Sequence, residues 1–297
     1  MTHKIPSSHI EKLTSVPPAT KITQVSNLQN HIQEILGDTH HTFLQGSYKN
    51  DTSISEINDV DIVAIRLRTF SGTHSPAHLR TTPNILWDTI FSEIEQKLKD
   101  QKKYIWTVTR GDKCIKVETN TLSADVVPAV QVLENHLVDP IAIFSFKKGL
   151  EKVNYPRVHW DNGKNKNQAT GGHYKPIVRI FKNWSKNHFA DLNIVSSYDL
   201  ESLVHGSNNT NFSNDHVDSF IKVASQIDTT LDLRRQSVFP IPSVCGSEDI
   251  LSNWDSTKYN TFHSQLKQSL ALARSAYVAT DIATAENLWK LAFKIQK

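Results

Sequence analysis

Two aspartates, Asp59 and Asp61, occupy alternate positions at the start of an apolar run that spans residues 60–65. The run is rich in β-branched residues and predicts a strand buried on both faces. Because side chains alternate along a strand, both carboxylates should project from one face, about 6.6 Å apart at Cα. Two anions beside a hydrophobic strand need compensation, and hard carboxylate oxygens suit Mg²⁺ or Mn²⁺. The pattern indicates a metal site.

A Gly-Ser turn, Gly46-Ser47, lies upstream of the aspartates and follows the apolar pair Phe43-Leu44. Glycine has no Cβ, so such a turn lets backbone N–H groups and a hydroxyl approach a phosphate closely. On its own, an Asp-x-Asp pattern more often means that the first aspartate, here Asp59, ends a turn and that the second, here Asp61, faces solvent. The upstream turn favours a nucleotide and metal site instead.

Together these segments, QGSY at 45–48 and DVDIV at 59–63, resemble the palm motif of the DNA polymerase β-like nucleotidyltransferases. The resemblance is to the cGAS/DncV-like group, which includes the oligoadenylate synthases. That family carries a third carboxylate on a neighbouring strand, and ADVVPA at 124–129 is similar to that strand. The resemblance implies two Mg²⁺ (or Mn²⁺) ions held by the catalytic residues Asp59, Asp61 and Asp125, and nucleotide binding by Gln45, Gly46 and Ser47.

A second resemblance lies in the C-terminal half. The segment IVRIFKNW at 177–184 has apolar residues at helical spacing, and SSYDLESLVH follows at 196–205. The pair is similar to the segments that form the far wall of the nucleotide cleft in the oligoadenylate synthases and cGAS. By that resemblance Lys182 and Arg179 hold the triphosphate, Ser197 hydrogen-bonds it and Tyr198 stacks on a base. Two basic residues on a helix are also typical of a solvated face, and a tyrosine at a helix start can pack into the core.

The N-terminal half predicts an α/β unit. Apolar residues from Ile22 to Leu36 recur at helical spacing before Gly37, a typical helix end. Thr82-Pro83 should open a second helix with a stripe from 85 to 98. Strands are expected at 60–67, at 104–109, at 113–118 and around Asp125, with Arg110-Gly111-Asp112 as a hairpin turn.

After Pro128 the pattern changes to longer helical periods. Residues 155–160 suggest an extended segment, and 161–172 an exposed loop. Helices should follow from about His173, over 217–231, over 262–277 and over 282–295. We therefore expect an α+β fold, with a nucleotidyltransferase palm and N-terminal helix at 1–130, a mainly helical lobe at 131–297, and the active site between them.

The amino-acid composition limits the kinds of substrate and binding partner that can be expected. The sequence contains 33 Lys and Arg residues and 30 Asp and Glu residues, which gives a formal net charge of +3. This mild excess permits an anionic substrate but predicts no long nucleic-acid footprint. The fourteen histidines show no ligand spacing around His40-His41, and Cys114 and Cys245 cannot form a disulfide framework. Without an apolar signal segment or run of membrane-spanning length, a cytoplasmic protein is expected.

The two-lobe pattern resembles the bacterial cGAS/DncV-like enzymes (CD-NTases) of CBASS antiphage defence. This implies joining of NTPs, ATP among them, into a cyclic di- or trinucleotide that activates an effector, with release of pyrophosphate. Two alternatives remain open. One is a linear oligoadenylate or terminal nucleotidyltransferase acting on RNA, and the other is a non-catalytic nucleotide-binding module, against which the complete set of three aspartates argues.

Overall fold

The computed structural model describes residues 5–54, 59–67, 69, 85–132, 139–189, 192, 194–237, 239–246 and 248–295. The chain divides into two compact units. Pro17–Trp160 form one, which we call the sheet unit, and Met1–Val16 with Asp161–Lys297 form the other, the helical unit.

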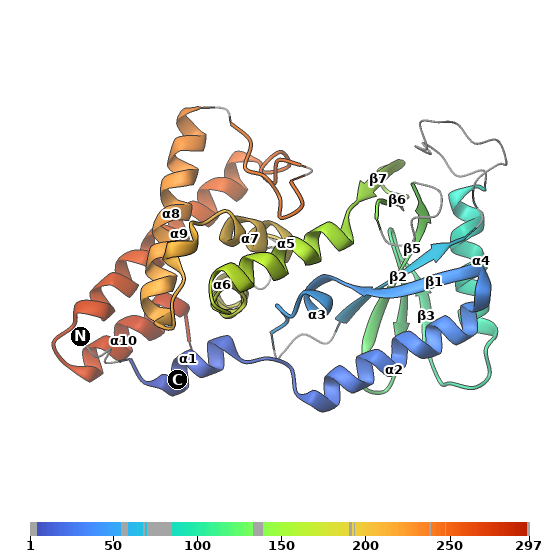
Figure 1. Cartoon of the computed structure of the whole chain (residues 1–297), viewed down its shortest axis with the longest axis horizontal. Helices are drawn as coiled ribbons and strands as arrows, with labels where there is room; N and C mark the ends of the chain where they lie inside the picture. The colour runs from blue at the N-terminus through green and yellow to red at the C-terminus, as the bar shows by residue number, and fades with distance from the viewer. Residues whose placement is uncertain are drawn as a thin grey trace. The chain divides into compact units, whose positions relative to one another are not determined.

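The sheet unit is built on seven strands in the order β1-β2-β5-β4-β3, with β6 paired to β5 and β7 paired to β6 (Figure 1). The central pair β2 and β5 is parallel, and the other described pairs are antiparallel. The strands are β1 (His40–Gln45), β2 (Asp59–Arg66), β3 (Thr107–Arg110), β4 (Ile115–Glu118), β5 (Ser123–Gln131), β6 (Ile141–Ser145) and β7 (Leu150–Asn154).

Two amphipathic helices, α2 (Ala19–Leu36) and α4 (Trp87–Asp100), pack on one face of this sheet. Gly37 ends α2 with a φ of 67°, a left-handed conformation that favours glycine. The short helices η1 (Gly37–Thr39) and α3 (Gly46–Asn50) flank β1. The core of this layer buries the helix stripes against alternate strand residues: Val25, Leu28, Ile32, Leu36, Ile90, Phe91, Ile94 and Leu98 against Val60, Ile62, Ala64, Ile115, Val117 and Val126.

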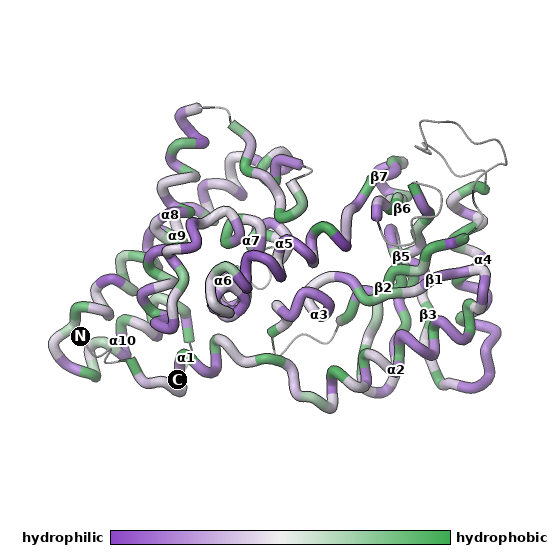
Figure 2. Tube along the Cα trace, in the orientation of Figure 1, coloured by the Kyte–Doolittle hydropathy of each residue, from purple (hydrophilic) through white to green (hydrophobic). Residues whose placement is uncertain are grey.

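A smaller cluster covers part of the opposite face of the sheet. Val63 and Ile65 of β2 join Ala129 and Ile141 there, all fully buried. The strand β2 is therefore apolar on both faces beyond its first residues, as predicted, and Figure 2 shows β2 and β5 as hydrophobic.

The helical unit contains the long helices whose apolar spacing the sequence predicted. Trp184 is at its centre, where its ring contacts Phe262 at a centroid distance of 5.7 Å and its indole N–H donates to Ser269 Oγ at 2.9 Å. The helices are α1 (Ser7–Thr14), the greater part of α5 (Pro156–Ala169), α6 (Tyr174–Phe189), α7 (Ser197–His205), η2 (Asn209–Asn211), α8 (His216–Gln236), α9 (Ser256–Val278) and α10 (Ile282–Phe293).

Two expectations about this part of the chain were wrong. Residues 155–160 and 161–172 are not an extended segment and a loop, because helix α5 runs through both. The unit boundary falls after Trp160 instead of residue 130, because β6 and β7 continue the sheet and α1 belongs to the helical unit. The expected helix start at Thr82-Pro83 lies outside the described residues; the helix itself is described from Trp87.

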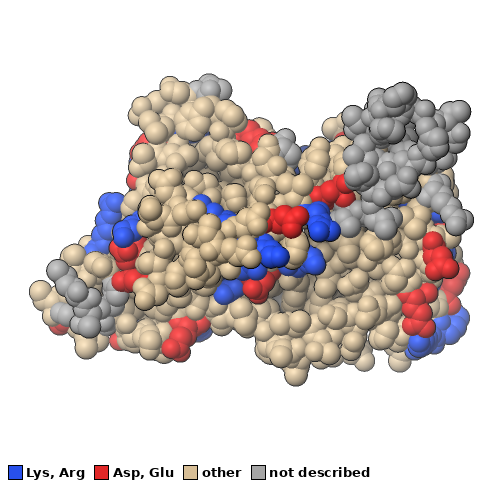
Figure 3. Space-filling view, in the orientation of Figure 1, with Lys and Arg blue, Asp and Glu red and all other residues tan. Residues whose placement is uncertain are grey.

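On the face drawn in Figure 3, Lys and Arg occur singly or in small groups beside Asp and Glu, separated by uncharged surface. Within the described residues, no helix combines the length and the apolar character needed to cross a membrane.

Candidate active site

A row of polar residues crosses four neighbouring strands of the sheet unit. Asp61 of β2 is the register partner of Asp125 on β5 and of Gln45 on β1. Asp125 is in turn opposite Lys116 on β4. Register partners project from the same face of a sheet, and adjacent strands are about 4.8 Å apart. The structure therefore brings Gln45, Asp61 and Asp125 together.

Asp59 is the first residue of β2, where its register partner is Ser123. Its side chain lies outside the described part of the structure, so the sharing of one strand face with Asp61 stays a prediction.

The burial of β2 explains why charge is tolerated at this end of a hydrophobic strand. Asp61 is exposed and Asp125 is half-buried, whereas Val60 and Ile62 are buried in the helix-covered layer. On the face of the carboxylates, the apolar cover begins only at Val63. The two aspartates are thus accessible to solvent and to a ligand, while the strand that carries them is anchored in the core.

Gly46 lies directly against Asp61. It is the first residue of α3, with a φ of 70°, and a Cβ built on it would stand 2.5 Å from Asp61 Oδ2. Such an approach is shorter than real Cβ contacts, so a side chain at this position would have to displace the Asp61 carboxylate. The Gly-Ser turn and the aspartate strand, which the sequence predicted to share a site, are in contact here.

Ser47, the next residue of α3, is anchored to the segment that follows. Its hydroxyl lies 3.3 Å from Ser53 Oγ, and its carbonyl accepts from the Thr52 N–H at 2.9 Å. The side chains of Thr52 and Ser53 are buried, which fixes the turn. Ser47 is half-buried and directly follows Gly46, the residue that lies against Asp61.

Asp61 and Asp125 fit a divalent cation by their chemistry. Both supply hard oxygen ligands from adjacent register positions, and neither is enclosed by the apolar core. Two carboxylates side by side repel one another unless a cation lies between or beside them. The donor set therefore suits Mg²⁺ or Mn²⁺.

In the helical unit, Lys182 of α6 forms a buried ion pair. Its ammonium lies 3.3 Å from Glu201 Oε2 of α7, and the two side chains are 3% and 5% exposed. Burial lowers the pKa of Lys182, and the adjacent Glu201 carboxylate opposes that effect. Arg179 is also buried, and its Nε donates to the Thr14 carbonyl at 2.7 Å. The sequence did not single out Glu201, although its place among the apolar residues Leu200, Leu203 and Val204 is a signal for such a pair.

This ion pair leads to a stability prediction. Changing Glu201→Gln should lower the free energy of unfolding by about 3 kcal/mol, because the Lys182 ammonium is then buried without a carboxylate partner. Glu286→Gln, which removes a surface ion pair with Lys290 on α10, should cost less than about 0.5 kcal/mol. Urea unfolding of both variants measures the difference, and equal small losses would contradict a buried pair.

Ser197 and Tyr198 form the first turn of α7. Ser197 is exposed, while the preceding Ser196 caps the helix by accepting from the Asp199 N–H at 3.0 Å. Tyr198 is half-buried, and its hydroxyl lies 3.4 Å from Cys245 Sγ. Burial, as the largest cause, raises the pKa of Tyr198 well above its ordinary value, so the phenol is neutral at physiological pH. The expected base stacking by Tyr198 stays a prediction.

One neighbour of the carboxylates, Lys116 on β4, was not anticipated. Ile115 and Val117 of β4 are fully buried in the helix-covered layer, so the residues that alternate with them face the carboxylate side. The alternation in β4 was readable from the sequence. Its pairing register with β5, which places Lys116 opposite Asp125, was not.

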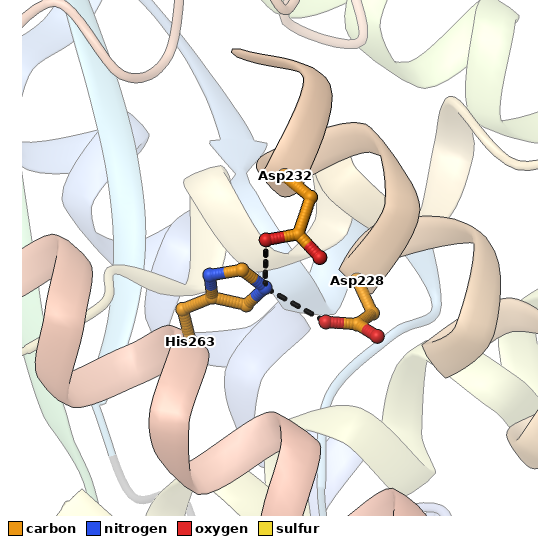
Figure 4. A group of neighbouring side chains, drawn as sticks. All are labelled: Asp228, Asp232 and His263. Atoms are coloured by element: carbon orange, nitrogen blue, oxygen red, sulfur yellow. Dashed lines mark hydrogen bonds and ion pairs between the residues drawn. The ribbon is translucent and has the colours of Figure 1, made fainter. Parts of the chain in front are cut away.

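A further cluster of possible metal ligands lies in the helical unit, far along the chain from the predicted site. His263 Nε2 of α9 is 2.7 Å from Asp228 Oδ1 and 3.9 Å from Asp232 Oδ1, both on α8 (Figure 4). The ammonium of Lys267 lies 3.7 Å from Asp228 and 3.0 Å from Asp232, and so already supplies a cation to both carboxylates. We interpret the group as an ion-pair cluster that joins α8 to α9.

Comparison with known proteins agrees with this arrangement. Residues 161–271 match the family described as cGAS/DncV-like nucleotidyltransferase C-terminal helical domain. The cyclic UMP-AMP synthase of Rhodothermus marinus is 32% identical over 196 residues, which cover 61% of this chain and 68% of that protein. The cyclic AMP-AMP-AMP synthase of an Acinetobacter species is 26% identical over 294 residues, covering 92% of this chain and 79% of that protein.

One solved structure is similar to this chain in both fold and sequence. It is the Rhodothermus marinus CdnE c-UMP-AMP synthase with Apcpp and Upnpp, which aligns with a TM-score of 0.70 at 25% identity. The alignment covers 89% of this chain and 96% of that one, so it extends over both the sheet and the helices. From these relationships and the carboxylate row of the sheet unit, we conclude that the chain belongs to the cGAS/DncV-like nucleotidyltransferases.

Proposed function

We propose that this protein joins ribonucleoside triphosphates into a cyclic di- or trinucleotide and releases one pyrophosphate for each bond formed. The observation that carries the proposal is the contact of three segments, with Asp61 opposite Asp125 and Gly46 packed against the Asp61 carboxylate. Family membership supports the reaction class, since the two relatives described above are cyclic nucleotide synthases by name. AMP occurs in both products, which supports ATP as one substrate.

The carboxylates Asp59, Asp61 and Asp125 would hold two Mg²⁺ or Mn²⁺ ions. When bound, such ions polarise a phosphate oxygen and lower the pKa of an attacking hydroxyl. Gly46 leaves the Asp61 carboxylate accessible, and the core beneath β2 and β5 fixes the two strands in register. The chain's own residues thus provide a rigid, solvent-accessible anionic site.

Nucleotide phosphates require donors near these carboxylates. The backbone of Gly46 and the hydroxyl of Ser47 are candidates in the sheet unit, and Gln45 is the register partner of Asp61 on β1. A hydroxyl or N–H directed at the departing phosphates would stabilise their developing charge. In the helical unit, Lys182, Arg179, Ser197 and Tyr198 remain the predicted nucleotide-binding residues.

The reaction we propose begins with attack by a ribose hydroxyl of one nucleotide on the α-phosphate of a second. The new phosphodiester P–O bond forms as the bond to pyrophosphate breaks, and the hydroxyl proton passes to solvent or to a carboxylate. Repetition of the step within the linear intermediate closes the ring. The product would serve as a cytoplasmic second messenger that activates an effector in antiphage defence.

The experiment that tests this reaction is incubation of purified protein with each α-³²P-labelled NTP and with NTP mixtures, in Mg²⁺ or Mn²⁺, followed by phosphatase. A cyclic product keeps all of its label because every phosphate lies within the ring, whereas NTPs lose theirs and a linear product loses the label of its 5′-terminal nucleotide but keeps the label of its internal phosphodiesters. A phosphatase-resistant product with one labelled phosphate for each nucleoside, together with pyrophosphate release, is the expected result. Pyrophosphate release that depends on added RNA, with label incorporated into the RNA, would replace the proposal by an RNA-extending activity.

A further inference from the structure

A short hairpin lies in the connection between α8 and α9 of the helical unit. It comprises residues 241–246 and 248–250, and we call it the α8–α9 hairpin. Its arms meet at an antiparallel bridge between Pro242 and Asp249. The Asp249 carboxylate accepts from Arg234 Nη2 at 2.7 Å, which ties the hairpin to the end of α8. These contacts fix the place of the hairpin within the helical unit.

The tip of the α8–α9 hairpin packs on α7. The Val244 N–H donates to Ser202 Oγ at 3.2 Å, and the Val244 carbonyl accepts from Asn162 Nδ2 at 2.9 Å. Ser202 Oγ in turn donates to the Tyr198 carbonyl at 2.8 Å, one helical turn earlier. Val244 and Ser202 are both buried. The hairpin therefore contacts the part of α7 that carries Tyr198.

The next residue of the hairpin, Cys245, lies against the side chain of Tyr198. The phenol oxygen is 3.4 Å from Cys245 Sγ, and the same sulfur is 3.3 Å from Ser243 Oγ. Because each of these groups can donate and accept a hydrogen bond, they form a chain that ends at the buried Ser243. The Tyr198 side chain is consequently held at both ends, by the helix backbone at Cα and by the hairpin at its hydroxyl.

Neighbouring contacts fix the helix turn that carries the ring. The residue after Tyr198, Asp199, accepts from Trp254 Nε1 at 3.1 Å and lies 3.9 Å from Lys258 Nζ of α9. With the backbone fixed, the remaining freedom of the Tyr198 side chain is rotation about its χ1 and χ2 bonds, which the contact at the hydroxyl restricts. A ring that is already ordered loses less conformational entropy when a ligand stacks on it.

We propose that Cys245 is a positioning residue for Tyr198: its sulfur holds the phenol so that the ring presents a fixed plane on which a nucleotide base stacks. This inference rests on the proposed function, in which Tyr198 is a nucleotide-binding residue. An ordered ring favours the bound nucleotide equally in the ground state and in the transition state. Cys245 should therefore act on nucleotide affinity and not on kcat.

The test measures nucleotide binding without turnover, by calorimetry with the α,β-methylene analogues of ATP, GTP, CTP and UTP. Cys245→Ala and Tyr198→Phe each remove one partner of the contact, the double variant removes both, and Cys245→Ser keeps a hydroxyl. Tyr198→Ala also removes the stacking face. The matched controls are Tyr277→Phe, at a half-buried tyrosine of α9, and Ser252→Ala, at an exposed residue between the hairpin and α9.

Thermal unfolding checks the fold of every variant, and kcat at saturating NTP is measured for the same proteins. Wild type and Asp61→Asn are assayed alongside for cyclic product, which tests the proposed function itself.

Cys245→Ala and Tyr198→Phe should each weaken the affinity for the analogues that wild type binds by about three- to tenfold, the effect of losing one hydrogen bond. Their kcat should stay within about twofold of wild type, since only uniform binding is lost. The double variant should bind no more weakly than the weaker single variant, because both changes remove the same contact. Tyr198→Ala should cost about tenfold or more through loss of stacking. Cys245→Ser and the two controls should bind like wild type.

Unchanged affinity in a folded Cys245→Ala or Tyr198→Phe protein would overturn the inference, and so would losses that multiply in the double variant. Unchanged affinity in Tyr198→Ala would overturn it as well, since the ring would then not contact the base. If Cys245→Ala does not fold, Tyr198→Phe decides the question alone. Absence of Asp61-dependent cyclic product from a wild type that binds the analogues would instead refute the proposed function and leave the positioning of Tyr198 standing.

Discussion

Changing Asp61→Asn is expected to reduce cyclic nucleotide formation by at least about 10³-fold, with little change in stability. Asp61 has Asp125 on one side, Gln45 on the other and Gly46 directly against it, so it is the centre of the row of polar residues. Asparagine keeps the shape but removes the charge needed to hold a divalent cation. Metal catalysis contributes several kcal/mol to such reactions, and about 4 kcal/mol corresponds to 10³-fold in rate.

Asp125→Asn should have a similar effect, because Asp125 is the register partner of Asp61. The control is Asp38→Asn, an exposed aspartate of η1 in the same unit, which should keep wild-type activity. The rate of phosphatase-resistant product is the measurement. An Asp61→Asn protein that retains more than a tenth of the wild-type rate would show that the metal site has been assigned to the wrong residues.

Changing Gly46→Ala is expected to reduce activity by about 100-fold or more through steric displacement of Asp61. The new Cβ would stand 2.5 Å from Asp61 Oδ2, so either the carboxylate or the start of α3 must move. A displacement of about 1 Å in a catalytic group typically costs 10²-fold in rate. The left-handed φ of 70° adds about 1–2 kcal/mol of backbone strain for any residue with a Cβ.

The control variant Gly149→Ala separates the effect of displacing Asp61 from the effect of backbone strain. Gly149 lies between β6 and β7 with a φ of 61°, but a Cβ on it meets nothing within 4 Å. This control should lose similar stability through strain and keep its activity. Thermal unfolding and initial rates are measured for both variants. If both lose activity equally, strain in the sheet unit and not contact with Asp61 is the cause.

The strands that carry the carboxylates were predictable because their signals are local. The apolar β-branched run after Asp59 indicated β2, and the ADVVPA segment indicated β5. The resemblance supplied the expectation that Asp125 would be on a neighbouring strand, and the structure places it in direct register with Asp61. The long helices α8 to α10 were similarly readable, since apolar stripes at helical spacing report burial directly.

Helix α5 escaped prediction because its own sequence is a poor helix former. It contains Asn162, Gly163, Asn165 and Asn167, residue types that favour turns and helix caps over helix interiors. Contacts from distant parts of the helical unit stabilise it. Asn162 donates to the Val244 carbonyl at 2.9 Å, and Lys166 donates to the Ser207 carbonyl. Tertiary contacts of this kind override local propensity and leave no periodic signal in the segment itself.

The burial of Lys182 also could not be predicted from the sequence. Its position beside an apolar stripe indicated a solvated lysine, and only the resemblance suggested a phosphate-binding one. Pairing with Glu201 depends on how α6 packs against α7, which spacing along one helix does not determine.

The measurement that tests the central claim most directly is the accurate mass of the purified product made by wild-type protein from unlabelled NTPs with Mg²⁺. A ring of two or three nucleotides has the summed mass of its nucleoside monophosphates less one water for each bond, with no 5′-triphosphate. We predict that mass from wild type and its absence from Asp61→Asn. A product that retains a 5′-triphosphate, or a cyclic product made equally by Asp61→Asn, would contradict the account.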